Sequence, residues 1–198
     1  MDKQVEAGPR EAGLKKVVMD QRAMVRALTR IAHEVVERNA DEPVKVVGIV
    51  RRGEVLAGLL ASEIGQITQE RPEVGTLDIS FYRDDVTQSI APVLHATHIP
   101  FSVDGEHIVL VDDVLYTGRT VRSALDALMD YGRPRTVQLA VMVDRGHREL
   151  PISADYVGKE VPSSHDEDVR VLIEPEDDRT AVEIWDLGAA HARKGGED

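Results

Sequence analysis

Two adjacent acids and a threonine–glycine turn form the stretch of this chain whose residue types are best suited to chemistry. Asp112 and Asp113 follow the apolar run 108–111, and residues 117–120 read Thr-Gly-Arg-Thr before a run with helical periodicity begins. A helix start offers free N–H groups and a positive dipole end, so such a turn favours an anion. Carboxylates beside it suit hydroxyl groups or a hydrated cation. The spacing predicts a site for a phosphate and a sugar; solvated loop acids or helix caps are the alternative.

A second polar turn follows another apolar run, residues 44–50. The run stops at Arg51, Arg52 and Gly53, and a helix is expected to begin near Glu54. The planar guanidinium of arginine matches phosphate oxygens, and glycine lets a ligand or another backbone come close. A surface turn with solvated arginines would have the same composition. In company with the two acids, this turn predicts a pyrophosphate-binding loop.

These turns need strands and helices that bring them to one edge of a sheet. Apolar runs and alternating patterns predict strands at 14–19, 44–50, 74–83, 108–111, 136–144, 169–173 and 181–185. Asp20 is expected to cap a helix, because the apolar residues Met24, Leu28, Ile31 and Val35 recur after it at helical spacing. Further helices are expected near 54–60 and 121–129. The alternation predicts an α/β fold with a mainly parallel sheet and helices on both faces.

The length and composition suit one globular domain. Of 198 residues, 42% are hydrophobic and 30% are charged, which is ordinary for a folded domain. We expect this domain to span 14–187, with disordered tails at 1–13 and 188–198, where glycine and charge occur without periodicity. The segment 86–100 also lacks periodicity and is expected to be a lid or a disordered loop.

Charge and residue usage narrow the classes of function. The net charge of −12 argues against wholesale binding to nucleic acid or anionic membranes, although it allows a local basic patch. There is no cysteine, which excludes disulfide bonds and thiolate metal sites. No apolar run is long enough to span a membrane and no signal peptide is recognisable, so we expect a soluble, cytoplasmic protein.

Four stretches carry a resemblance to a known family. The run 108–120 has the hydrophobics, two acids, hydrophobic and Thr-Gly that are typical of the phosphoribosyl-pyrophosphate signature of type I phosphoribosyltransferases. The other three stretches are 26–34, 77–85 and 144–159. Together they resemble the bifunctional pyrimidine-operon regulators and uracil phosphoribosyltransferases over about residues 19–173. The resemblance implies a type I phosphoribosyltransferase fold, with a five-stranded, mainly parallel core sheet flanked by helices and a small hood.

The resemblance also implies a reaction, in which uracil and phosphoribosyl pyrophosphate give UMP and pyrophosphate with Mg²⁺. Asp112 and Asp113 would hold the ribose hydroxyls, directly or through the hydrated Mg²⁺, and stabilise positive charge that develops on the ribose ring. Tyr82 and Arg83 would belong to a mobile loop that closes over the pyrophosphate and excludes water. The resemblance assigns the 5′-phosphate to Thr117, Gly118, Arg119 and Thr120, and the pyrophosphate to Arg51, Arg52 and Gly53.

The base is expected to be uracil. Purine-salvage members of the fold usually carry an acid just before the Thr-Gly, whereas Tyr116 occupies that position here. This substitution argues against a hypoxanthine or guanine enzyme. By motif, Tyr156 and Val157 align with residues that cover the base and read it through backbone groups.

A second activity implied by the resemblance is binding to the leader of pyrimidine-operon messenger RNA, strengthened by UMP or UTP. The matched positions are Thr29, His33, Arg38, Arg148 and Lys159. Thr29 and His33 lie four residues apart and can address one ligand from one helical face. Ser153 stands where the family often has arginine, and one cation fewer weakens a phosphate-binding surface.

Two other functions fit the same residues. One is an RNA-binding nucleotide sensor with little or no catalysis, against which the intact acids and arginine turn argue. The other is a phosphoribosyltransferase for another base that binds no RNA. Regulators of this kind generally self-associate, so a homo-oligomer is expected, without a subunit number from the sequence.

Overall fold

The computed structural model describes residues 13–40, 42–80 and 96–187. Tyr82, Arg83 and most of the unpatterned segment 86–100 lie outside these ranges, as do the tails except Gly13. None of the described helices is both long and apolar enough to cross a membrane.

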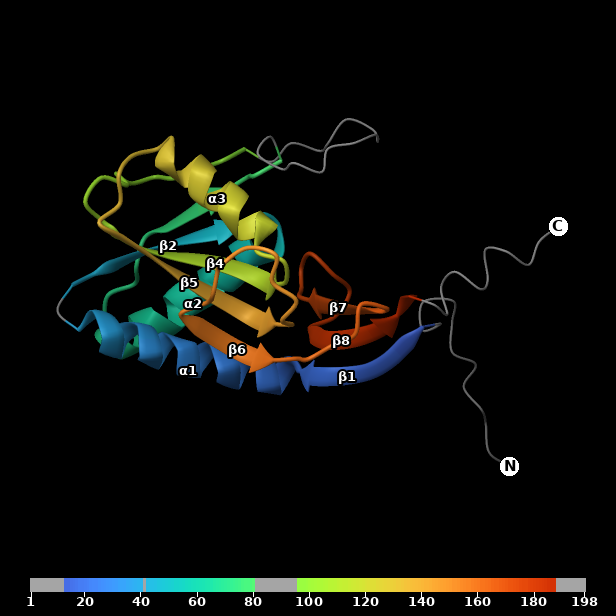
Figure 1. Cartoon of the computed structure of the whole chain (residues 1–198). Coiled ribbons are helices and arrows are strands. Elements are labelled where there is room, and N and C mark those ends of the chain that lie inside the picture. Colours follow the sequence, from blue (N-terminus) through green and yellow to red (C-terminus); the bar gives the residue numbers. More distant parts are fainter. Residues whose placement is uncertain (1–12, 41, 81–95, 188–198) are drawn as a thin grey trace, which may run out of the picture.

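A five-stranded sheet forms the centre of the molecule (Figure 1). Its order is β3-β2-β4-β5-β6, and every neighbouring pair is parallel. The strands are β2 (Val44–Ile49), β3 (Val74–Leu77), β4 (His107–Leu115), β5 (Thr136–Asp144) and β6 (Tyr156–Glu160). Because the strands are parallel, the turns after β2, β4 and β5 emerge at one edge. The predicted five-stranded core sheet is confirmed.

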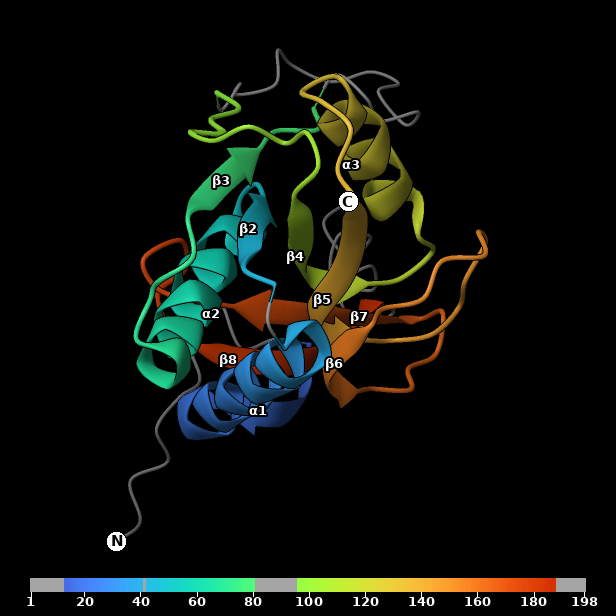
Figure 2. The same cartoon turned by 90° about the vertical axis from the view of Figure 1, so that its left-hand side faces the viewer.

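Three helices cover the two faces of this sheet (Figure 2). Helices α1 (Gln21–Asn39) and α2 (Arg52–Thr68) lie on one face, and α3 (Arg119–Met129) lies on the other. Successive strand residues point to opposite faces, so Val46 and Val109 pack in the core with α1 and α2, while Val47 and Ile108 pack in the core with α3. The Asp20 carboxylate accepts a hydrogen bond of 2.7 Å from the Ala23 amide, so the predicted N-cap of α1 is confirmed.

A smaller antiparallel sheet forms the hood at the carboxyl ends of the core strands (Figure 1). Its order is β1-β8-β7, from β1 (Leu14–Asp20), β8 (Ala181–Asp186) and β7 (Glu167–Leu172). The first strand of the chain therefore pairs with the last, in a register where Met19 faces Val182. This pairing joins the two ends of the described chain.

Three elements differ from the predictions. The strand expected over 74–83 ends at Leu77, because the Asp78 carboxylate accepts bonds of 2.8 and 2.6 Å from the amide and hydroxyl of Ser80 in a local turn. Strand β4 continues through both acids to Leu115, instead of ending before them. Strand β6 was not predicted, because its five residues carry no periodicity that distinguishes them from the preceding turn.

Candidate active site

The two polar turns singled out in the sequence meet at one edge of the core sheet. Strands β2 and β4 are direct neighbours, with Gly48 opposite Val111. A Cβ atom at Gly53 would lie 2.6 Å from the Val111 carbonyl oxygen, so only glycine lets the start of α2 approach β4 this closely. The close backbone approach expected at Gly53 is therefore present, and it brings Arg52 beside the acids.

The two acids differ in their surroundings. Asp112 is 5% exposed, and its Oδ1 accepts a bond of 2.9 Å from the Asp113 amide. The Asp113 side chain is 24% exposed, and its Oδ1 accepts a bond of 2.9 Å from the Val114 amide. Burial raises the pKa of Asp113, and the positive charge of Arg52 acts in the opposite direction. Asp113 thus presents the more accessible carboxylate of the pair.

Arg52 links the pyrophosphate turn both to the acids and to the hood. Its Nη1 lies 3.9 Å from Asp113 Oδ2. Its Nε and Nη2 donate bonds of 2.8 Å to the two carboxylate oxygens of Asp177, in the loop between β7 and β8. Arg51 is exposed, and the peptide bond that precedes it is cis. One guanidinium therefore spans three segments that are far apart in sequence.

The predicted phosphate turn surrounds a hollow of about 300 Å³. Residues 114–121 and Glu149 line it, and α3 begins at its rim. Gly118 adopts a φ of 93°, a left-handed conformation that favours glycine, and Thr117 Oγ1 lies 3.4 Å from the Arg119 amide. The Arg119 guanidinium binds the Glu149 carboxylate at 2.7 Å across the hollow. This hollow has the position and the helix start that an anion site needs.

Tyr116 has neighbours that sequence reasoning did not single out. The Arg145 guanidinium lies over its ring at 4.2 Å, and the His147 ring is edge-on with centroids 6.1 Å apart. Arg148, predicted to bind RNA, donates a bond of 2.8 Å to the Tyr116 carbonyl oxygen and also pairs with Asp144. The block 144–159 marks these residues by family likeness, but nothing in their spacing reveals a stack on Tyr116.

The two other residues assigned to the base begin strand β6. Tyr156 is 3% exposed at the start of β6, where it pairs with Ala140, and its hydroxyl donates a bond of 2.6 Å to Gln138. The Val157 carbonyl oxygen accepts a bond of 2.8 Å from Arg30 of α1. Both residues lie at the start of core strand β6, and their contact with the base stays a prediction.

Four of the predicted RNA-binding residues lie on α1 and the adjacent strand β6 (Figure 2). His33 and Lys159 are exposed. Thr29 donates a bond of 2.7 Å to Glu63 of α2, and Arg38 forms an ion pair of 2.7 Å with Asp155. Arg148 lies in the loop after β5, where it bonds the Ile152 carbonyl oxygen at 2.9 Å and pairs with Asp144. Ser153 is exposed.

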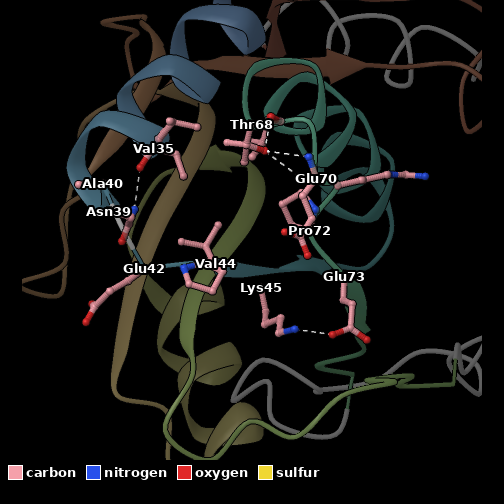
Figure 3. Close-up of a pocket in the computed structure, with 14 residues that line it drawn as sticks. Val35, Asn39, Ala40, Glu42, Val44, Lys45, Thr68, Glu70, Pro72 and Glu73 are labelled. Atoms are coloured by element: carbon pink, nitrogen blue, oxygen red, sulfur yellow. Dashed lines mark hydrogen bonds and ion pairs between the residues drawn. The ribbon is translucent and has the colours of Figure 1, made fainter.

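A second hollow, of about 490 Å³, lies at the opposite end of the core sheet (Figure 3). It is formed where α1 and α2 end and β2 begins, with an apolar lining that includes Val35, Val44 and Pro72. Its polar groups bind one another: Lys45 pairs with Glu73, and the Thr68 hydroxyl bonds the Ile64 and Glu70 carbonyl oxygens. Among the described residues, no buried side-chain N or O atom lacks a hydrogen-bond partner.

Comparison with known proteins gives concordant results. Residues 16–175 match the family model of the phosphoribosyl transferase domain. The chain is 58% identical over 155 residues to the Bifunctional protein PyrR of Roseiflexus sp. (strain RS-1), covering 77% of this chain and 85% of that protein. It is 52% identical over 176 residues to the protein of the same name from Bacillus cereus (strain B4264), covering 87% and 98%.

Solved structures agree at the level of the fold. A hypoxanthine phosphoribosyltransferase from Staphylococcus aureus superimposes with a TM-score of 0.68 at 18% identity, covering 92% of this chain and 98% of that one. The hypoxanthine phosphoribosyltransferase of Trypanosoma cruzi gives a TM-score of 0.65 at 14% identity, covering 87% and 97%. The described architecture and the matched family model thus agree, and the chain belongs to the phosphoribosyltransferase family and, within it, to the Bifunctional protein PyrR group.

Proposed function

We propose that this protein is a pyrimidine-operon regulator that binds leader messenger RNA in response to uridine nucleotides and also makes UMP from uracil and phosphoribosyl pyrophosphate. The observation that carries the catalytic part is the meeting of three groups at one sheet edge. These are Arg52, Asp113 and the hollow lined by residues 114–121. Each suits a different part of one donor molecule.

The donor is held by charge and by free backbone amides. The 5′-phosphate binds in the hollow at the start of α3, through Thr117, Gly118, Arg119 and Thr120. The pyrophosphate binds at the start of α2 and at the turn Arg51, Arg52 and Gly53. Negative charge grows on pyrophosphate as the C–O bond to ribose breaks, so cationic and N–H groups there stabilise the transition state. Tyr82 and Arg83 are proposed to cover it.

The two acids act on the ribose. Asp113 binds the ribose hydroxyls and, with Asp112, stabilises the positive charge that develops on the ring. The carboxylate oxygens of Asp113 also suit Mg²⁺, which prefers oxygen ligands and retains several of its waters. When bound, Mg²⁺ neutralises part of the pyrophosphate charge.

Uracil is proposed to lie beside Tyr116, which follows β4 directly and precedes the phosphate turn. Tyrosine offers an apolar ring and a hydroxyl but no carboxylate to a base. Tyr156 and Val157 contribute at most through the β6 backbone. The related hypoxanthine phosphoribosyltransferases share the fold at identities below 20%, which does not assign their base to this chain.

RNA is proposed to bind the surface formed by α1 and β6, with Thr29, His33, Arg38 and Lys159 as contacts. The chain carries a net charge of −12, so these contacts must supply a local attraction that the whole protein does not. Arg148 contributes through the loop it stabilises. The protein is proposed to act as a homo-oligomer.

One assay tests the catalytic proposal. Purified protein is mixed with phosphoribosyl pyrophosphate, Mg²⁺ and, in separate reactions, uracil, hypoxanthine or guanine, and pyrophosphate release is followed. We expect uracil-dependent release with UMP as the product. Release with a purine only would show that the acceptor is a purine and not uracil. No release at high protein concentration would leave the nucleotide-sensor alternative. Filter binding of the leader RNA with and without UMP tests the regulatory part.

A further inference from the structure

Arg145, which the proposed function does not use, is a buried arginine at the carboxyl end of β5. It is 7% exposed. Its Nε donates a bond of 3.0 Å to the Ser163 hydroxyl, and its Nη2 donates bonds of 3.2 and 2.7 Å to the carbonyl oxygens of Ser164 and Glu167. Its backbone amide donates a bond of 3.1 Å to the Leu115 carbonyl oxygen. The edge of the guanidinium is therefore fixed by the connection between β6 and β7.

The face of the same guanidinium lies over Tyr116. Its central carbon is 4.2 Å from the ring centroid, within the range of a cation–π contact. The backbone of Tyr116 is held by a different residue, because the Tyr116 carbonyl oxygen accepts a bond of 2.8 Å from Arg148. Arg148 therefore fixes the backbone position of Tyr116, and Arg145 fixes the orientation of its ring.

The contacts of Arg145 require an arginine. The planar guanidinium can stack through its face while its edge donates several hydrogen bonds. A lysine ammonium has no flat face, so it cannot combine the two contacts. The three accepting oxygens are a hydroxyl and two carbonyls, and the Arg145 charge also helps to lower the pKa of the nearby Glu167 carboxyl group. The edge of the guanidinium is thus satisfied by the connection between β6 and β7, and its face is left for the Tyr116 ring.

Arg145 also connects Tyr116 to the hood. Glu167 is the first residue of β7, and its carboxylate pairs with Lys15 of β1. Ser163 and Ser164 lie between β6 and β7. A shift of the hood sheet would therefore move the guanidinium on which the Tyr116 ring rests.

We propose that Arg145 is a positioning residue for the acceptor base. It stacks on Tyr116 and holds the ring in the orientation in which a pyrimidine packs beside it. Its hydrogen bonds link that orientation to the hood. This rests on the proposed function, in which the base lies beside Tyr116. Arg145 acts through Tyr116 and does not touch the reacting atoms.

A double-mutant cycle tests the proposal, with KM measured separately for uracil and for phosphoribosyl pyrophosphate. Arg145→Met and Tyr116→Leu should each raise KM for uracil about tenfold, since each removes the same stack. KM for phosphoribosyl pyrophosphate should stay within about twofold, and Arg145→Met/Tyr116→Leu should be no worse than the worse single variant. Arg145→Lys should raise the KM for uracil nearly as much as Arg145→Met does, because the lysine ammonium has no stacking plane.

Arg170→Met is the matched control. Arg170 stacks on Trp185 at 4.6 Å within the hood. The variant therefore loses a guanidinium–aromatic contact of the same kind, but away from Tyr116. Uracil KM should not change in this variant. Multiplying effects in the double variant, or equal increases in both KM values, would overturn the proposal and make Arg145 a structural cation. If Arg145→Met does not fold, Arg145→Lys replaces it in the cycle.

The proposed function and this inference fail in different ways. If the wild-type protein makes no UMP, the catalytic proposal falls, and the same cycle is then measured by calorimetry with UMP as the ligand. If the wild-type protein makes UMP but the two substitutions act independently, only the role of Arg145 falls.

Discussion

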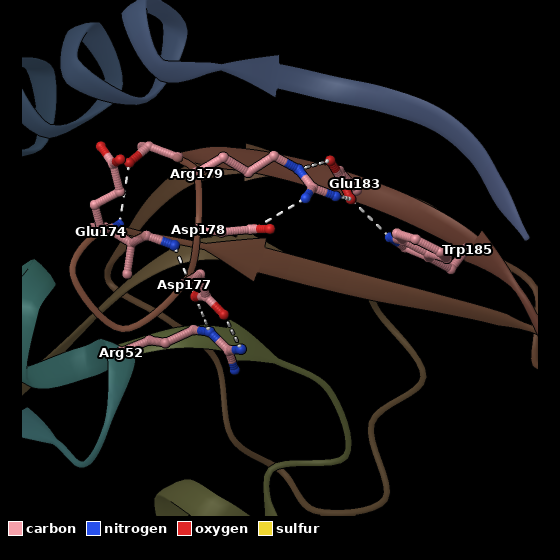
Figure 4. Close-up of polar contacts among 9 residues, drawn as sticks. Arg52, Glu174, Asp177, Asp178, Arg179, Glu183 and Trp185 are labelled. Atoms are coloured by element: carbon pink, nitrogen blue, oxygen red, sulfur yellow. Dashed lines mark hydrogen bonds and ion pairs between the residues drawn. The ribbon is translucent and has the colours of Figure 1, made fainter. Parts of the chain in front are cut away.

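The guanidinium of Arg52 donates two hydrogen bonds of 2.8 Å to the carboxylate of Asp177, and so joins the turn after β2 to the hood loop between β7 and β8 (Figure 4). Asp177 also accepts a bond of 2.9 Å from the Ile173 amide, which fixes its own loop. The hydrogen bonds from Arg52 hold the pKa of Asp177 below its usual range. The orientation of the Arg52 guanidinium therefore depends on an ionised hood residue.

Asp177→Asn should destabilise the protein at neutral pH by about 1–2 kcal/mol, because a hydrogen-bonded, partly exposed ion pair is lost. The pKa of Asp177 is lower in the folded than in the unfolded protein, so its contribution is present above the unfolded value and is lost as the pH falls through the folded value. Urea unfolding of both proteins at neutral and acidic pH should show a gap that closes in acid.

Asp178→Asn serves as the control for this measurement. Asp178 is the next residue, with a half-exposed side chain that pairs with Arg179 at 3.0 Å. Its substitution should change the free energy of unfolding by less than about 0.5 kcal/mol. A gap between Asp177→Asn and wild type that persists unchanged in acid would contradict the ion-pair explanation.

Gly53→Ala should disrupt the meeting of the two turns. The added Cβ would lie 2.6 Å from the Val111 carbonyl oxygen, so α2 or β4 must move at a cost of about 1–3 kcal/mol. We expect kcat/KM for phosphoribosyl pyrophosphate to fall at least about tenfold, since a small displacement of catalytic groups is costly. Gly58→Ala, in the same helix with open space around its Cβ position, should instead stabilise the protein slightly. Equal behaviour of the two variants would show that the contact is unimportant.

Asp113 should control the acid side of the pH–rate profile. Burial raises its pKa, so the acid limb of kcat/KM should lie above the value of about 3.9 that is usual for aspartate. Arg52 lowers this pKa, so Arg52→Met should move the limb to higher pH as well as reduce the rate. A limb that stays in place in Arg52→Met would mean that another group titrates.

Asp112→Asn/Asp113→Asn should reduce turnover by at least about a hundredfold.

RNA binding should be separable from catalysis. Thr29→Ala/His33→Ala should weaken binding to the pyrimidine-operon leader at least about tenfold, while UMP formation persists, because both residues lie in the middle of α1 and not in the turns that follow β2 and β4. Filter binding and the pyrophosphate assay on the same preparation measure the two activities. Thr68→Ala is the matched control: the Thr29 hydroxyl donates a bond of 3.1 Å to the Val25 carbonyl oxygen, and the Thr68 hydroxyl at the end of α2 donates a bond of 3.0 Å to the Ile64 carbonyl oxygen. An unchanged RNA affinity in the α1 variant would remove this surface from the proposal.

The hood contains a buried acid, Glu183, whose carboxylate is hydrogen-bonded by neighbouring side chains. Glu183 is 2% exposed, and it accepts bonds of 2.9 and 3.1 Å from Arg179 and 2.9 Å from the Trp185 indole (Figure 4). Every member of this group comes from β8 or the loop before it. The polar group is thus satisfied locally, and sequence alone gave no sign that Trp185 would carry a hydrogen bond to a carboxylate.

Local chemistry is what the sequence by itself determined. Apolar runs of period two or less identified most strands, and the helix after Asp20 was evident from spacing and its cap, because these signals depend only on neighbouring residues. The phosphate turn 117–120 and the arginine turn 51–53 could be singled out for the same reason. Strand β6 and the true end of β3 could not, since short strands are decided by pairing partners and by side-chain turns such as that of Asp78.

Only the tertiary structure decided which distant residues share a site. The strand order places β2 beside β4, so Arg52 meets Asp113 across about sixty residues of chain, and it places the hood loop with Asp177 on the other side of the same arginine. It also moved Tyr156 into the core and put Arg145 on Tyr116. Contacts of this kind follow from strand order and crossover geometry, which no local pattern encodes, because burial and hydrogen bonding across the sheet are satisfied by the fold as a whole.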